Sequence, residues 1–133
     1  MRTVFLDTVG LIAVWERTDQ WHPAATEVFA EMLVDGVALV TTPHVLLECG
    51  NALSRRPSRV EVVQLRNDLS EIGGLIVPTA EEEESAWKAY ARGEAGQAGI
   101  VDHISFVAMR RLRLIEAFTH DDHFKAAGFV TLF

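Results

Sequence analysis

The sequence predicts a three-layer α/β domain with a central parallel sheet, and three observations support this prediction. Short apolar runs alternate along the chain with longer segments whose apolar residues recur at helical spacing. The runs are apolar throughout, which is typical of strands that helices bury on both faces. No repeat, low-complexity segment or linker interrupts the 133 residues, so we expect a single domain over residues 1–133.

Five short apolar runs are expected to form the strands. The first begins close to the N-terminus and ends abruptly at Asp7. The third follows the pair Gly73-Gly74, which is expected to end the preceding helix. In chain order, the expected strands are residues 3–6, 37–40, 75–77, 114–119 and 129–132.

Helices are expected between these runs, several of them with clear start signals. Thr42 is a typical N-cap and Pro43 a typical first helical residue, while Thr79 caps a helix whose first turn is acidic. The segment 92–99 is rich in Gly and Ala and is expected to be a loop. The other expected helices begin near Val9, Asp19, Ser58, Val101 and Asp122.

Composition and charge exclude several classes of protein. Apolar residues make up 49% and charged residues 23%, as in ordinary globular domains, which excludes wholesale disorder. The formal net charge of −7 argues against strong non-specific binding to nucleic acid, but not against an enzyme that meets phosphates through bound cations. No apolar run approaches the roughly 20 residues that a membrane span needs. The single cysteine, Cys49, and an N-terminus that turns acidic too early for a signal peptide lead us to expect a cytoplasmic protein.

Four acidic residues differ from the rest by their place in the predicted fold. Asp7 directly follows the first strand, and Asp121 lies two residues beyond the fourth, so both fall at the carboxyl edge of the sheet, where α/β proteins bind ligands. Asp102 falls in the first turn of the helix that begins near Val101. Glu48 lies inside the helix after Pro43 among apolar neighbours, and we expect it to be at least partly buried.

Each acid taken alone has an ordinary explanation, because Asp is a common helix cap and Glu can extend from a crowded helix into solvent. Taken together, they indicate a metal site. Carboxylates that converge without Lys or Arg between them repel one another unless a divalent cation joins them. A ligand set made only of oxygen favours Mg²⁺ or Mn²⁺ over zinc.

Four sequence segments, found in order along essentially the whole chain, make the sequence recognisable. They are residues 4–8 (VFLDT), 48–53 (ECGNAL), 101–106 (VDHISF) and 118–124 (FTHDDHF), the last followed by Gly128 and Phe129. With these segments the sequence resembles the PIN-domain ribonucleases, and specifically the VapC-type toxins of prokaryotic toxin–antitoxin systems. One departure is Gly99, which stands where the family often has Ser.

The resemblance implies a set of site residues. The family's four metal-site acids fall on Asp7, Glu48, Asp102 and Asp121. Thr119 matches a hydroxyl residue that positions a water or a carboxylate, and Thr8 and Asn51 match polar positions near the site. The family's sheet order also implies that Asp7 and Asp121 follow adjacent central strands.

The resemblance further implies an activity and partners. It implies a nuclease that uses Mg²⁺, or Mn²⁺ in its place, to cleave RNA internally and leave a 5′-phosphate and a 3′-hydroxyl. It implies a homodimer and a cognate VapB-type antitoxin that inhibits the enzyme. A PIN-like scaffold that has lost catalysis and binds RNA or protein remains the alternative, although none of the four acids is missing.

The remaining candidates are weaker. Arg55 and Arg56 begin a basic patch, which fits either a solvated helix end or contacts with RNA phosphates. A zinc cluster of His120, Asp121, Asp122 and His123 is unfavoured, because two His three apart at a strand-to-helix junction rarely face one point. Cys49 lies on an apolar helix and is an unpromising nucleophile. A receiver domain or a haloacid-dehalogenase-type phosphatase would place a second acid close to Asp7, and the sequence has none there.

Overall fold

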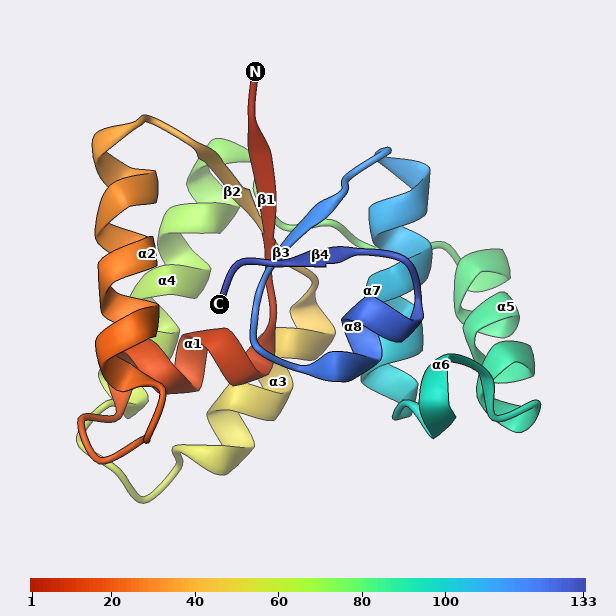
Figure 1. Ribbon diagram of the computed structural model, residues 1–133, viewed down its shortest axis with the longest axis horizontal. Coiled ribbons are helices and arrows are strands. Elements are labelled where there is room, and N and C mark those ends of the chain that lie inside the picture. Colours follow the sequence, from red (N-terminus) through yellow and green to blue (C-terminus); the bar gives the residue numbers. More distant parts are fainter.

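The computed structural model describes residues 1–133 and contains a four-stranded parallel sheet in the order β2-β1-β3-β4 (Figure 1). In β1, Val4, Phe5 and Leu6 are fully buried because strands flank β1 on both sides and helices cover both of its faces. The strands are β1 (Thr3–Leu6), β2 (Ala38–Val40), β3 (Glu116–Phe118) and β4 (Val130–Thr131).

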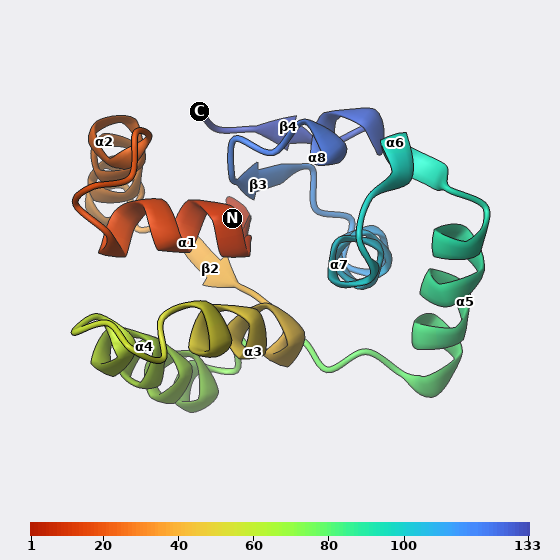
Figure 2. The same ribbon diagram turned by 90° about the horizontal axis from the view of Figure 1, so that it is seen from below.

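Helices form a layer on each side of the sheet (Figures 1 and 2). On one side lie α1, α2 and α4; on the other lies α7, with α5 packed on its outer surface. This confirms the three-layer α/β/α prediction. None of the eight helices combines the length and apolar character needed to cross a membrane. They are α1 (Thr8–Trp15), α2 (His22–Val34), α3 (Pro43–Ala52), α4 (Arg59–Ile72), α5 (Ala80–Ala91), α6 (Glu94–Gln97), α7 (Ile100–Arg111) and α8 (Asp122–Ala126).

The expected strand at residues 75–77 does not form. Leu75 makes one parallel bridge with Thr41, through hydrogen bonds to the backbone groups on either side of Leu75, and the pairing ends there. Val77 is exposed and precedes Pro78, which has no backbone N–H to donate to a neighbouring strand. The chain instead leaves the edge of the sheet and leads into α5.

Two helical boundaries also differ from the sequence prediction. The second helix begins at His22 and not near Asp19, because the Asp19 carboxylate accepts a hydrogen bond from the Trp21 backbone N–H and forms a turn there. The expected loop at 92–99 contains α6, a single short turn in which Ala95 and Gly96 have left-handed backbone angles.

A close approach between α1 and β3 fixes the geometry where the candidate site residues lie. A Cβ atom on Gly10 would stand 2.1 Å from the Phe118 carbonyl oxygen, so only glycine allows α1 to lie this close. In the same region the Asp7 backbone N–H donates to the Phe118 carbonyl. The first turn of α1 is thereby held against the carboxyl end of β3.

Candidate metal centre

Asp7 and Thr119 meet at the carboxyl ends of the two central strands. The register pairs Leu6 with Phe118, so the residues that follow, Asp7 and Thr119, lie side by side. The Thr119 hydroxyl donates a 2.8 Å hydrogen bond to Asp7 Oδ2 and accepts one of 3.0 Å from the Asp121 backbone N–H. Asp7 is 1% exposed. Of the two roles the resemblance allows, positioning a water or a carboxylate, the hydrogen bond to Asp7 fits the second.

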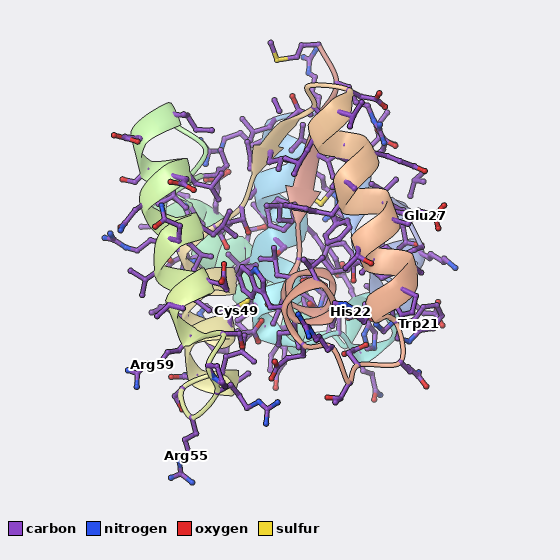
Figure 3. The ribbon with its side chains drawn as sticks, turned by 90° about the vertical axis from the view of Figure 1, so that its left-hand side faces the viewer. Trp21, His22, Glu27, Cys49, Arg55 and Arg59 are labelled. Atoms are coloured by element: carbon purple, nitrogen blue, oxygen red, sulfur yellow. The ribbon has the colours of Figure 1, made fainter.

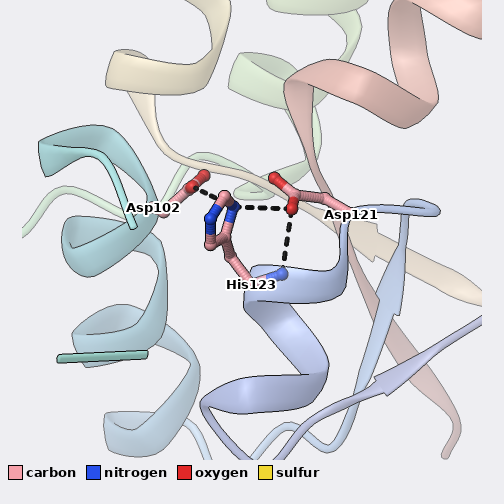
Figure 4. A group of neighbouring side chains, drawn as sticks. All are labelled: Asp102, Asp121 and His123. Atoms are coloured by element: carbon pink, nitrogen blue, oxygen red, sulfur yellow. Dashed lines mark hydrogen bonds and ion pairs between the residues drawn. The ribbon is translucent and has the colours of Figure 1, made fainter. Parts of the chain in front are cut away.

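Asp121 and Asp102 approach each other from two different helices (Figure 4). Asp121 is the N-cap of α8, and its Oδ1 accepts a 2.9 Å hydrogen bond from the His123 backbone N–H. Asp102 lies in the first turn of α7, as expected. The His123 side chain lies between the two carboxylates, with Nδ1 2.8 Å from Asp121 Oδ1 and 3.9 Å from Asp102 Oδ2. One ligand atom from each of these three residues lies within 4.8 Å of the other two.

Glu48 reaches the cluster from α3, but the expectation that it is partly buried is wrong. Its side chain is exposed, because α3 packs Val45 and Cys49 on the core and directs Glu48 to the outer face. The Thr8 hydroxyl donates a 2.6 Å hydrogen bond to Glu48 Oε1, so the carboxylate is oriented from the first turn of α1. Asn51 is also exposed, one turn further along α3.

The pKa values show that the acids act on one another. Burial, and then the negative charge of Asp102, raise the pKa of Asp7 from its ordinary value of 3.8 to about 8, against the opposing hydrogen bond from Thr119. Burial, and then the charges of Asp121 and Glu48, raise the pKa of Asp102 to about 6. No Lys or Arg forms an ion pair with any of the four acids. The donor set therefore fits a divalent cation, which would offset this charge.

His123 is the residue that sequence reasoning missed. The sequence places it only in an unfavoured zinc cluster with His120, Asp121 and Asp122, and His120 does not join such a cluster, because its ring stacks on Trp21 with centroids 4.4 Å apart. The sequence signal that places His123 near the site is its position two residues after Asp121. A residue in the first turn of a helix that Asp121 caps stays close to the capping carboxylate.

Neither the basic candidates nor Cys49 forms an ion pair with the four acids. Arg55 and Arg59 extend away from the body of the protein at the end of α3 and the start of α4, while Cys49 lies inside (Figure 3). Arg56 is held by an ion pair between its Nε and Glu16 Oε1 at 2.7 Å. Burial, and then the charges of Asp7 and Glu48, raise the pKa of Cys49 to about 12, so its thiol stays protonated at neutral pH.

Comparison with known proteins places the chain in a family. The chain matches the PIN domain over residues 4–130. It is 32% identical over 128 residues to the 23S rRNA-specific endonuclease VapC20 from two strains of Mycobacterium tuberculosis, covering 96% of this chain and 95% of the relative. The crystal structure of M. tuberculosis VapC20, a sarcin–ricin loop cleaving toxin, matches with a TM-score of 0.79 and 30% identity over 96% of both chains. The chain therefore belongs to the PIN-domain family of nucleases and is a relative of its VapC-type toxins.

Proposed function

We propose that this chain is a metal-dependent endoribonuclease of the VapC type, which hydrolyses phosphodiester bonds in RNA with Mg²⁺, or with Mn²⁺ in its place. The observation that carries the proposal is the convergence of acids from four elements with no Lys or Arg among them, one of them the buried Asp7. Buried carboxylates can all be ionised together only when a cation offsets their charge. The relatives' action on 23S rRNA supports RNA as the substrate.

In this proposal the acids are the metal ligands, and the neighbouring hydroxyls orient them. Thr119 fixes the Asp7 carboxylate, and Thr8 fixes that of Glu48. The ion, when bound, supplies a water of lowered pKa and positive charge beside the scissile phosphate. One of the carboxylates also accepts the proton that the attacking water loses. The proposed ligands are Asp7, Glu48, Asp102 and Asp121.

We further propose that the RNA approaches along the end of α3. Arg55 is exposed there and free to contact a phosphate, whereas the ion pair with Glu16 limits Arg56. Asn51 is exposed on the same helix as Glu48 and supports the site from that side. Since the protein carries a net charge of −7, such local cations are the available means of attracting the RNA backbone.

A VapB-type antitoxin is the proposed inhibitor, and two features support it. An apolar cavity of about 440 Å³ lies between α1, α2 and α4, and Glu61 and Asp68 are among its lining residues. The acidic cluster also attracts a basic chain segment. We expect a stoichiometric excess of the cognate antitoxin, bearing a basic C-terminal segment, to stop cleavage; unchanged cleavage would contradict this proposal.

We propose that the chain works as a single-domain homodimer in the cytoplasm, where its RNA substrate is found. Leu47 and Val63 are 67% and 57% exposed and lie beside a mainly apolar cavity of about 360 Å³ between α3 and α4. Covering this face with a second copy would bury apolar surface. Light scattering after gel filtration should give twice the mass of the chain, and Leu47→Glu should give the mass of one chain.

Cleavage of RNA tests the proposed function directly. A mixed RNA pool that includes the sarcin–ricin loop of 23S rRNA is incubated with Mg²⁺, with Mn²⁺ or with EDTA. We expect cleavage that needs the metal and that falls by at least about 100-fold in Asp7→Asn. Asp122→Asn is the matched control, because that neighbouring carboxylate is 91% exposed and its ion pair is with Lys125. A folded, antitoxin-free protein that binds metal but cuts no RNA would favour the silent scaffold instead.

A further inference from the structure

We infer that His123 is a nitrogen ligand of the ion that Asp102 and Asp121 hold, and that this ligand makes the site favour Mn²⁺ over Mg²⁺. The inference rests on the proposed metal site and adds to it a ligand that is not an acid. His123 belongs to the compact three-residue group described above, whereas Asp7 and Glu48 lie outside that group. The imidazole is thus placed better for an ion at Asp102 and Asp121 than either of the other two carboxylates.

The spacing of the three ligand atoms fits one shared ion. Atoms bound to one such ion at about 2.1 Å lie about 3.0 Å apart when adjacent and about 4.2 Å apart when opposite. His123 Nδ1 lies 2.8 Å from Asp121 Oδ1 and 3.9 Å from Asp102 Oδ2. In the coordinated arrangement the ion takes the place of the proton that His123 Nδ1 shares with Asp121 Oδ1 (Figure 4).

The backbone around His123 places the residue beside Asp121. The His123 N–H is bonded to Asp121 Oδ1, which ties the first turn of α8 to one of the two acids. On another side of the ring the α6 turn approaches closely, since a Cβ on Gly96 would stand 3.6 Å from His123 Cδ2. The side chain is still 42% exposed, so an ion can enter from solvent.

A nitrogen ligand changes which metal the site prefers. Mg²⁺ is a hard cation that binds oxygen ligands and keeps several waters, whereas imidazole nitrogen suits transition metals. Of the two ions proposed for this family of sites, Mn²⁺ gains from His123 and Mg²⁺ gains little. Replacing His123 with a residue that offers an oxygen ligand is therefore expected to lower the ratio of the Mn²⁺ affinity to the Mg²⁺ affinity.

Pulsed electron paramagnetic resonance of bound Mn²⁺ tests the inference without depending on activity. The wild-type protein with one equivalent of Mn²⁺ should show coupling of the electron spin to a nitrogen nucleus, and His123→Gln should lose that coupling. Calorimetry should show Mn²⁺ binding weakened by about tenfold or more in His123→Gln, with a smaller change for Mg²⁺. His120→Gln is the matched control, because its ring stacks on Trp21 outside the cluster, and it should keep both the coupling and the affinity.

Each outcome decides the question. Mn²⁺ that binds without nitrogen coupling, or with coupling that persists in His123→Gln, overturns the inference and leaves the proposed nuclease site intact. No binding of either metal to the folded wild-type protein overturns the metal site and the inference together. The wild-type spectrum alone decides whether a nitrogen ligand is present, and a folded His123→Gln, checked by circular dichroism, assigns that ligand to His123.

Discussion

Thr119 joins the acids of the site through a single hydroxyl. The hydroxyl donates to Asp7 and accepts from the backbone of Asp121, so it fixes the relative position of two proposed ligands. Thr119→Val keeps the shape of the side chain but removes the hydroxyl. The buried Asp7 carboxylate and the half-buried Asp121 backbone N–H then each lose this hydrogen bond. We expect a loss of about 1–3 kcal/mol in the free energy of unfolding and a fall of about tenfold or more in cleavage.

Urea unfolding and cleavage assays check this prediction, with Thr119→Ser as the control. Serine retains the hydroxyl and should recover most of the stability and the activity. If Thr119→Val matches the wild type in both assays, the hydroxyl has no part in arranging the site.

The buried Asp7 predicts a pH dependence of the metal-free protein. Its pKa is raised from 3.8 to about 8 in the folded state, so between these values the folded protein binds more protons than the unfolded chain. Stability from this group is therefore present at low pH and is lost as the pH rises from about 4 to about 8. Asp102 acts in the same direction up to a pKa of about 6.

Asp7→Asn isolates this effect, because asparagine cannot ionise. In EDTA we expect the variant to gain stability over the wild type as the pH rises, on the order of a few kcal/mol at about pH 8. Denaturant unfolding across this pH range measures the difference. A difference between the two proteins that stays constant with pH would contradict the raised pKa.

At the level of the elements, the contact of α1 with β3 predicts a sensitive glycine. Gly10→Ala would place a methyl group 2.1 Å from the Phe118 carbonyl oxygen, so the helix or the strand must move. We expect a loss of about 3 kcal/mol or more in the free energy of unfolding, together with reduced cleavage, because Asp7 begins the same helix. Gly50→Ala is the control, since a Cβ on Gly50 meets nothing within 4 Å. Equal stability of the two variants would contradict this account of the contact.

Elements with local start and stop signals were predictable from the sequence. The Thr79 cap, the Thr42 cap and the Gly73 that ends α4 all act within one turn of the chain, and the structure has each of them. The strand expected at 75–77 failed because pairing depends on a partner far away in sequence, and only Thr41 meets it.

The site shows the same difference between local sequence signals and packing that depends on distant segments. The Asp7 and Asp121 positions followed from strand ends, and the Asp102 position followed from a helix start; the structure has all three in place. The exposure of Glu48 depends on which face of α3 packs on the core, and the place of His123 depends on the rotation of α8 against α7. Apolar neighbours in sequence do not determine either of these.

At the scale of the whole molecule, the parallel sheet is what makes the site possible. Its order places β1 beside β3, so Asp7 and Thr119 meet although 112 positions separate them. Helices α3 and α7 bring Glu48 and Asp102 to the same edge, although 54 positions separate these two residues in the sequence. The sheet and its helices thus gather four acidic side chains at one edge of the molecule. The proposed nuclease activity depends on a cation that neutralises their charge.

The most direct test of that claim is to locate the ion. Crystals of the wild-type protein grown with Mn²⁺ are measured at a wavelength where manganese scatters anomalously. We predict an anomalous peak beside the Asp7, Asp102 and Asp121 carboxylates, with lower occupancy in crystals of Asp7→Asn. An occupied manganese site elsewhere, with no peak between these acids in the wild-type protein, would contradict the account.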